Sequence, residues 1–461
     1  MPDFDLTVIG SGPGGYVAAI HAARMGARVA ILEQDAEEWG GTCLNRGCIP
    51  TKTLIQCAEV LHTVRRAREF GVSVAEPSVD WTAMQSRKDW VVRGMRRGVQ
   101  GLLQANGVEM ITARGRLAGG TRVSADGREL ESRAVLLATG SSVAVPPIPG
   151  VDLCLTSDTI LQLDHVPTSL IVIGGGVVGM EFAGIFSLLG ARVTVAEMLD
   201  QILSPVDPQV AARFMKVMGG RSVEIHVGAR VEEVVRDAET DLLRVRFASG
   251  VELRAEQVLL AAGRRPNTDD LGLEAAGVAT ERGAITVDEH LRTSAEGVYA
   301  IGDATGISML AHTASYQGEV AVANALGEKR ISADYTAIPA CVYTDPEIAY
   351  VGLSEAQARA RGGEVKVGQF PFSALGRAMV LGETDGVVRV VADGDGYLLG
   401  VTIMGPRATD LIAEAALALN TGITAAELSH VVHAHPTLPE AIAEAALDVD
   451  GRAVHIAPRR R

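Results

Sequence analysis

The chain contains the same glycine pattern twice, and this duplication constrains its fold more than any other feature. Each copy follows a short apolar run that we expect to be a buried strand, and each precedes an expected helix. A strand, a glycine turn and a helix in this order place backbone N–H groups around a pyrophosphate. We therefore predict two Rossmann-like dinucleotide-binding units, and hence an α/β fold. The glycines are Gly10, Gly12 and Gly15 in the first copy, and Gly174, Gly176 and Gly179 in the second.

An acidic residue ends the second expected strand of each unit. Glu33 and Glu197 stand at equivalent distances from the third glycine of their motifs. A carboxylate there accepts hydrogen bonds from ribose hydroxyl groups and repels the 2′-phosphate of NADP. Two units predict two dinucleotides, which we interpret as a bound flavin and a diffusible nicotinamide. Because no arginine directly follows Glu197, we expect NAD rather than NADP.

A string of thirteen residues from Gly40 to Lys52 predicts redox chemistry. It contains Cys43 and Cys48 behind a Gly-Gly pair, and we expect a helix over residues 49–58. A helix beginning near Cys43 would favour thiolates through its N-terminal dipole. Two neighbouring cysteines can accept and give two electrons as a disulfide and a dithiol. The alternatives are two inert cysteines or half of a zinc site, but the sequence has no second pair at metal spacing, so we predict no metal.

The composition limits the classes of function. The net charge of −14 argues against a nucleic-acid partner, and no apolar run reaches the eighteen residues of a membrane span. The acidic N-terminus does not resemble a targeting segment. Five cysteines in 461 residues are too few for a disulfide framework, so we expect a cytoplasmic protein in a reducing compartment. We expect the isolated Cys57, Cys154 and Cys341 to be buried apolar filling.

The remaining chain divides by composition into a first flavin-binding part (1–142), a nicotinamide-binding part (143–267), a segment completing the flavin region (268–336) and a C-terminal interface domain (337–461). Asp303 follows an apolar strand, where it could hold the ribityl hydroxyls of a flavin or cap a helix. We expect the backbone around Ala311 to lie beneath the flavin ring. Further candidate cofactor contacts are Gly41, Thr42, Lys52, Gly115, Thr139, Gly140, Val231 and Gly263.

The last chemical motif runs from His433 to Glu440. Its two histidines could be metal ligands or polar loop residues. His435, however, has Glu440 five residues later, and a carboxylate beside an imidazole orients the ring and stabilises its charged form. We therefore interpret His435 and Glu440 as a general acid–base pair.

Together these motifs resemble the pyridine nucleotide–disulfide oxidoreductases over nearly the whole chain. They are most similar to the branch that serves 2-oxoacid dehydrogenase complexes and the glycine cleavage system. The strings that carry the resemblance are Gly40 to Lys52, Gly174 to Glu181, Ala300 to Asp303, Met309 to His312 and His433 to Glu440. The resemblance implies two FAD/NAD(P)-binding domains, a C-terminal α+β dimerisation domain, tightly bound FAD and NAD⁺ as acceptor.

The resemblance also implies roles for individual residues. Cys43 would be the thiol that meets lipoamide, and Cys48 would lie against the flavin. Lys52 and Glu181 would form an ion pair beside the flavin and the nicotinamide. His435 and Glu440 would reach the disulfide of the other subunit of a homodimer, and the His435–Pro436 bond would be cis. The substrate would be dihydrolipoamide on the lipoyl domain of an acyltransferase or of a glycine-cleavage carrier protein.

Three alternatives differ in the features they require. A glutathione-reductase-like enzyme would usually read NADP through arginines, where this chain has Glu197. A mercuric reductase needs a C-terminal cysteine pair, but no cysteine follows Cys341. A non-catalytic NAD-binding subunit would have lost a reacting residue, and none is lost. The chain departs from the family pattern at Thr51, Thr313 and Pro439, of which Pro439 could alter how Glu440 is presented.

Overall fold

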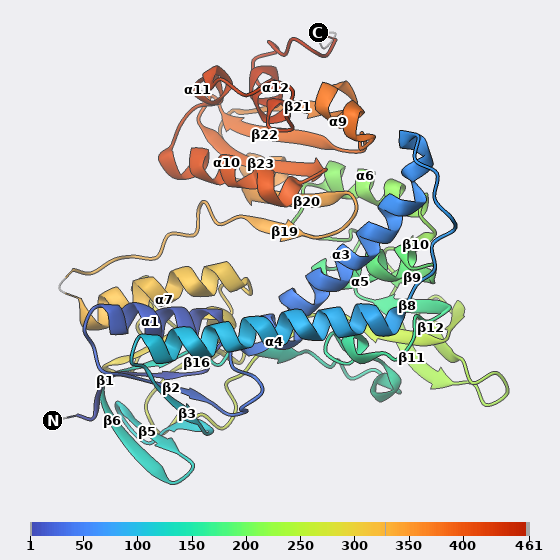
Figure 1. The fold of residues 1–461 in the computed structure, drawn as a ribbon. Coiled ribbons are helices and arrows are strands. Elements are labelled where there is room, and N and C mark those ends of the chain that lie inside the picture. The colour runs from blue at the N-terminus through green and yellow to red at the C-terminus, as the bar shows by residue number, and fades with distance from the viewer. Residues whose placement is uncertain (1, 328, 458–461) are drawn as a thin grey trace.

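The computed structural model describes residues 2–327 and 329–457. It has three sheet-containing parts joined by two long helices, α3 (Cys48–Arg65) and α4 (Trp81–Ala105) (Figure 1). The first nucleotide unit lies at the lower left of the view, the second at the right, and the C-terminal sheet at the top. The predicted fold class, α/β with two Rossmann-like units and a C-terminal α+β part, agrees with this architecture.

The first sheet is built on β1 (Phe4–Ile9), the predicted buried strand before the first glycine motif. It pairs in parallel with β2 (Val29–Glu33) and β6 (Arg128–Leu137). After the second unit the chain returns, because β18 (Val298–Ala300) pairs in parallel with β6. The sheet order is β3-β2-β1-β6-β5-β4, with β3 (Glu109–Thr112), β4 (Gly115–Leu117) and β5 (Arg122–Ala125) completing it. The exact boundaries of the four predicted parts stay a prediction.

Helices α1 (Pro13–Arg24) and α7 (Ala311–Leu326) pack against each other beside this sheet (Figure 1). Their contact is close because Gly14 and Gly318 face the partner helix: an added Cβ on Gly318 would lie 2.8 Å from the Gly14 carbonyl oxygen. This packing fixes the start of α7 next to the first glycine motif.

The second sheet repeats the first in a smaller form, in the order β10-β9-β8-β14. A three-stranded antiparallel sheet, β11-β12-β13, follows β10 in the chain and packs its apolar side chains against those of β8, β9 and β14. Its elements are β8 (Ser169–Ile173), α5 (Val177–Leu188), β9 (Arg192–Ala196), α6 (Pro208–Gly219), β10 (Val223–His226), β11 (Val231–Arg236), β12 (Leu243–Phe247), β13 (Glu252–Ala255) and β14 (Gln257–Leu260). Short strands β7 (Ser141–Val143) and β15 (Arg264–Pro266) pair where the chain passes between the two units.

The C-terminal part is a five-stranded sheet of order β19-β20-β23-β22-β21 in which every adjacent pair is antiparallel. Its strands are β19 (Ala340–Val342), β20 (Glu347–Gly352), β21 (Val365–Pro371), β22 (Val387–Asp393) and β23 (Leu398–Gly405). Its helices are α8 (Glu355–Ala360), α9 (Gly376–Leu381), α10 (Ala408–Thr421), α11 (Ala425–His430) and α12 (Glu440–Asp448). The sheet buries its apolar face against α10 and α12.

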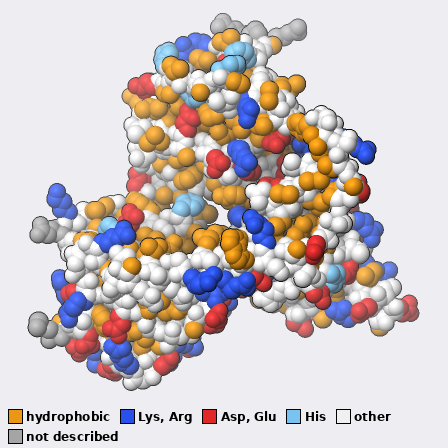
Figure 2. Space-filling view, in the orientation of Figure 1, with side chains coloured by type: hydrophobic (Ala, Val, Ile, Leu, Met, Phe, Trp, Pro, Cys, Tyr) orange, Lys and Arg blue, Asp and Glu red, His pale blue; other side chains and the backbone are white. Residues whose placement is uncertain are grey.

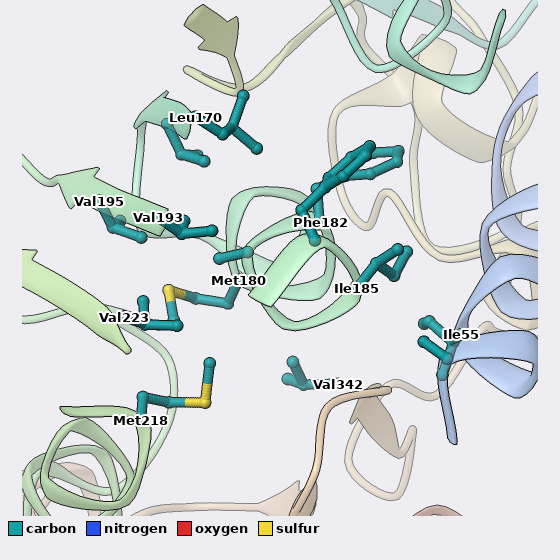
Figure 3. Close-up of a cluster of buried hydrophobic side chains, with 14 of the residues drawn as sticks. Ile55, Leu170, Met180, Phe182, Ile185, Val193, Val195, Met218, Val223 and Val342 are labelled. Carbon is teal, nitrogen blue, oxygen red and sulfur yellow. The ribbon is translucent and has the colours of Figure 1, made fainter. Parts of the chain in front are cut away.

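One hydrophobic cluster joins α3 to the second nucleotide unit and the C-terminal part (Figure 3). Met180, Phe182 and Ile185 of α5 contribute to it beside Val193 and Val195 of β9, while Ile55 of α3 and Val342 of β19 approach from the other side. Burying these side chains fixes α3 against α5, since each fully buried aliphatic or aromatic side chain contributes about 1.5–3 kcal/mol. The cluster therefore sets the relative position of the polar residues on these two helices.

The surface is mixed in character. Figure 2 shows acidic, basic and hydrophobic side chains interspersed over one face, with basic side chains gathered over the middle of the arginine-rich α4. Among the helices of the described ranges, none has both the length and the apolar character needed to cross a membrane.

Candidate functional site

A cavity of about 990 Å³ opens between the first sheet, the start of α3 and the start of α5. It brings together most of the residues predicted from the first half of the sequence. The predicted residues on its wall are Gly10, Gly12, Glu33, Gly41, Thr42, Cys43, Cys48, Lys52, Gly115, Thr139, Gly140, Glu181, Asp303 and Ala311. Gly15 is not on the wall. The volume of the cavity suits a large cofactor, since typical ligand sites occupy roughly 300–1,000 Å³.

The glycine turn at one end of the cavity fits a pyrophosphate. Gly10 has a φ of +104°, and a Cβ on Gly15 would lie 1.9 Å from the Gly10 carbonyl oxygen. Gly41 approaches from the redox segment, where an added Cβ would lie 2.5 Å from the Gly12 Cα. A side chain at any of these three positions would collide with neighbouring backbone, so only glycine lets these segments pack closely around the start of α1, where a phosphate could bind.

Glu33 lies at the end of β2 and is buried. Its Oε2 accepts a hydrogen bond from the Ser11 hydroxyl at 2.6 Å, and its Oε1 accepts one from the Gln34 N–H at 2.9 Å. The carboxylate is thus fixed on the cavity wall with lone pairs to spare, as a ribose-binding group requires. Ser11, inside the glycine motif, was not predicted.

Cys43 and Cys48 form a disulfide, as predicted, with a Cα–Cα distance of 4.7 Å. The helix expected over residues 49–58 lies within α3, which begins at Cys48 and extends to Arg65. It does not begin near Cys43, because Cys43 lies on a separate short helix, α2 (Gly41–Arg46). Gly47, with φ −132° and ψ −112°, breaks the two helices. Cys48 therefore occupies the first turn of α3, where the helix dipole favours a thiolate when the disulfide is reduced.

Lys52, one turn after Cys48 on α3, meets Glu181 on α5. Lys52 Nζ lies 2.8 Å from Glu181 Oε1 and 2.7 Å from Oε2, so both carboxylate oxygens accept from it. Glu181 Oε1 also accepts the Tyr343 N–H at 3.0 Å, and Lys52 Nζ lies 4.6 Å from the centre of the Tyr343 ring. The C-terminal segment thereby contributes to this site, which sequence reasoning missed because Tyr343 carried no motif.

Asp303 lies in the first turn of a 3-10 helix (Gly302–Thr305) and is not its N-cap residue. The Ser141 hydroxyl donates to its Oδ2, and Arg264 Nε donates to that hydroxyl at 2.7 Å. Arg264 follows Gly263 at the end of the second unit, so both units support the Asp303 carboxylate. Its place on the cavity wall suits a hydroxyl-binding role better than helix capping.

The second glycine motif lies outside this cavity. A Cβ on Gly179 would lie 2.0 Å from the Gly174 carbonyl oxygen, which repeats the geometry of the first motif. Glu197 Oε2 accepts the Gly175 N–H at 2.7 Å, and its Oε1 accepts the Leu199 N–H at 2.8 Å. Gly263 has a φ of +110°. The side chain of Val231 is buried in the core beside β12, so only its backbone could contact a nucleotide.

His435 and Glu440 form the predicted pair but do not line the cavity of their own chain. His435 Nδ1 lies 2.8 Å from Glu440 Oε1, and the Thr437 N–H donates to Glu440 Oε2 at 2.6 Å. Burial opposes ionisation of Glu440, but the Thr437 N–H and the His435 ring outweigh it and hold the pKa of the carboxyl below its usual value. The His435 side chain is 80% exposed, and the His435–Pro436 bond is cis.

The remaining cysteines are half-buried rather than fully buried. Cys341 lines the cavity, contrary to its predicted role as apolar filling, but burial raises the pKa of its thiol to about 11. A thiol with that pKa stays protonated at neutral pH and is a poor nucleophile. No group of three or more His, Cys, Asp or Glu side chains suited to a metal ion occurs in residues 2–327 and 329–457.

Known proteins match this architecture over its full length. Residues 4–318 match the family described as pyridine nucleotide-disulphide oxidoreductase, and residues 338–446 match the dimerisation domain of that family. The chain belongs to the pyridine nucleotide-disulphide oxidoreductases. The dimerisation domain supports the predicted homodimer.

Individual relatives extend the comparison. A dihydrolipoyl dehydrogenase of Bacillus subtilis is 39% identical over 98% of this chain and 99% of its own length. One from Thermus scotoductus is 41% identical over 100% of both chains. The crystal structure of LpdA from Mycobacterium tuberculosis has a TM-score of 0.88 at 31% identity, covering 96% of this chain and 98% of that one. The predicted enzyme class, a disulfide oxidoreductase using FAD and NAD, is thereby confirmed.

Proposed function

We propose that this chain oxidises dihydrolipoamide to lipoamide and passes the electrons to NAD⁺. The observation that carries the proposal is that the Cys43–Cys48 disulfide and the Lys52–Glu181 pair lie on the wall of the same cavity as the first glycine turn. The full-length dihydrolipoyl dehydrogenase relatives support the same substrate. A flavin bound in this cavity supplies two-electron transfer between a dithiol and a nicotinamide.

The chain's own residues perform the thiol chemistry. His435 takes the proton of one substrate thiol, and the resulting thiolate attacks Cys43 Sγ. The Cys43–Cys48 bond breaks, a mixed disulfide forms, and Cys48 becomes a thiolate at the start of α3. The second substrate thiol then releases its proton to solvent as its sulfur attacks the substrate sulfur of the mixed disulfide, and the departing Cys43 thiolate takes back the first proton from His435. Lipoamide closes, Cys43 is released, and two electrons remain on the protein dithiol.

The charged residues prepare this chemistry. Glu440 orients the His435 ring and stabilises its imidazolium form, as a carboxylate does for a general base. The Lys52 ammonium provides positive charge one turn from Cys48, which favours its thiolate. Glu197 selects NAD over NADP by accepting ribose hydroxyls.

The exposed His435 requires a second subunit. On its own chain it lies outside the cavity that contains Cys43. We propose that each active site pairs the cysteines of one subunit with His435 and Glu440 of the other. We further propose a cytoplasmic enzyme whose substrate is carried by a lipoyl domain of an acyltransferase or a glycine-cleavage carrier protein.

Mixed dimers test this arrangement. Cys48→Ser and His435→Gln chains should each be inactive alone in dihydrolipoamide oxidation. After the two are unfolded and refolded together with FAD, random pairing should restore about a quarter of the wild-type rate, because half the sites in each mixed dimer are intact. A mixture that stays inactive, although mixed dimers are detected by mass spectrometry, would contradict a shared site.

A further inference from the structure

The helix that presents Glu440 has a carboxylate at three successive turns. Glu440, Glu444 and Asp448 lie four residues apart on α12, and each accepts a backbone N–H from a segment outside the helix. Repeated like charges on one side of a helix are unfavourable by a few tenths of a kcal/mol per pair. Their partners must offset this cost, so each carboxylate holds α12 to a neighbouring segment.

Glu444 joins α12 to the C-terminal segment. Its Oε2 accepts from the Val454 N–H at 2.9 Å and the His455 N–H at 3.2 Å, while its Oε1 lies 2.8 Å from His455 Nδ1. The Glu444 side chain is only 11% exposed, and Ile456 packs against the same core as α12. A buried carboxylate with three donors is a strong fixed contact, because removal of its donors would leave it unsatisfied.

The other end of α12 is fixed by the sheet. Asp448 Oδ2 accepts the Gln369 N–H of β21 at 2.8 Å. A Cβ on Gly368 would lie 2.0 Å from the Ala445 carbonyl oxygen, so the helix backbone lies directly on the strand. The first turn of α12, which carries Glu440, buries Ala441 and Ile442 in the same core, and the contacts of Glu444 with the C-terminal segment lie one turn further along the helix.

We propose that Glu444 is a positioning residue for the His435–Glu440 pair, acting through α12 and the C-terminal segment. This inference rests on the proposed function of His435. When Glu444 holds the second turn of α12, Glu440 keeps the distance and direction from which it orients the His435 ring. Without the Glu444 contacts the second turn of α12 is less restrained, so Glu440 shifts from the position in which it orients the His435 ring.

The test compares four variants of the full-length holoenzyme. Glu444→Ala removes all three contacts, Glu444→Gln keeps an oxygen that can accept from Val454 and His455, and His455→Ala keeps the backbone contacts alone. Arg452→Gln is the matched control, because it changes charge in the same segment and Arg452 pairs with Asp450 rather than with Glu444. The substrates are dihydrolipoamide and NAD⁺.

Glu444→Ala should lower kcat about tenfold to a hundredfold, since misplaced general bases lose much of their contribution. Its KM for dihydrolipoamide should change far less than its kcat, because Glu444 lies outside the cavity that contains Cys43. Charged groups near the pair are His433 and Glu414, which the variants leave in place. Glu444→Gln should restore most of the rate, His455→Ala should be intermediate, and Arg452→Gln should match the wild type.

A second measurement does not depend on turnover. Hydrogen exchange followed by mass spectrometry should show faster exchange at residues 437–444 in Glu444→Ala, with residues 387–405 unchanged. A wild-type kcat in Glu444→Ala together with wild-type exchange would overturn the inference. Failure of the wild-type protein itself to oxidise dihydrolipoamide would instead contradict the proposed function, and the exchange data would still decide whether Glu444 restrains α12.

Discussion

Lys52 of α3 and Glu181 of α5 connect the two nucleotide units through an ion pair of 2.7 Å at the wall of the cavity. The Glu181 side chain is almost fully buried, at 4% exposure, while that of Lys52 is 30% exposed towards the cavity. The hydrophobic cluster of α3, α5 and β19 fixes both helices around this pair (Figure 3). The position of this charged pair beside the redox disulfide therefore depends on the packing between the two nucleotide units.

Removal of one partner of this pair should destabilise the protein more than removal of both. Glu181→Met leaves the Lys52 ammonium without its carboxylate, which should cost about 1–3 kcal/mol in the free energy of unfolding. The double variant Lys52→Met, Glu181→Met should recover much of this loss but not the activity. Denaturant unfolding measures the difference in the free energy of unfolding. Asp241→Asn, which removes a partner of the exposed Arg236–Asp241 pair, is the control and should change this free energy by close to zero. Equal stability of the single and double variants would refute the coupling.

Loss of either redox cysteine should abolish turnover while the fold persists. Cys43→Ser and Cys48→Ser should lower dihydrolipoamide oxidation by roughly a thousandfold or more, because the covalent route is lost. NADH should still reduce the bound flavin, as followed by its visible absorbance. Cys154→Ser is the matched control, since burial raises the pKa of its thiol to about 11 and its side chain lies outside the cavity. Residual activity in Cys48→Ser close to wild type would exclude the dithiol mechanism.

Nicotinamide selectivity should depend on Glu197. We expect kcat/KM to favour NADH over NADPH by roughly a hundredfold or more, because the carboxylate repels a 2′-phosphate. Glu197→Ser should lower the ratio of kcat/KM for NADH to kcat/KM for NADPH, mainly by weakening the binding of NADH. Glu224→Ser on the neighbouring strand should leave this ratio unchanged. Equal use of both cofactors by the wild type would contradict this assignment.

Stability should fall as pH rises from about 4.5 to about 7 because of Glu59 on α3. Burial, with the negative charges of Glu347 and Asp345, raises the pKa of Glu59 from its usual 4.5 to about 7. The folded protein therefore holds a proton that the unfolded chain releases, so this stabilisation is complete below about pH 4.5 and is lost through pH 7. Glu59→Gln should flatten the fall in melting temperature between pH 5 and 8, unlike the exposed Glu76→Gln. A parallel pH dependence in wild type and Glu59→Gln would refute it.

The sequence predicts local structure best where ligand binding and backbone conformation both require the same residue type. Gly10 and Gly15 sit in the turn that only glycine allows, and the carboxylates of Glu33 and Glu197 stand at the strand ends where the motif places them. The His435–Glu440 contact follows from their five-residue spacing, which brings the loop residue His435 next to the first residue of α12. These features are short-range, so a pattern of neighbouring residues is sufficient to indicate them.

Features that depend on contacts between residues far apart in the sequence could not be predicted from the sequence. The non-helical backbone at Gly47 separates the two cysteines onto different helices, and no local sequence pattern marks this break. Tyr343 reaches Glu181 only after the C-terminal sheet docks on α5, and no local signal marks it. The hydrogen bond between Glu444 and His455 likewise joins a helix to a C-terminal segment in which we recognised no motif.

The central claim is that this protein oxidises dihydrolipoamide with NAD⁺ through the Cys43–Cys48 disulfide. The most direct test is NADH formation by the purified, flavin-loaded dimer with dihydrolipoamide, alongside reduced glutathione and NADP⁺ as alternative substrates. We expect rapid turnover with dihydrolipoamide and NAD⁺ alone, with none in Cys48→Ser. No turnover in the wild type, while NADH still reduces its flavin, would contradict the claim and indicate that the Cys43–Cys48 dithiol acts on another disulfide substrate.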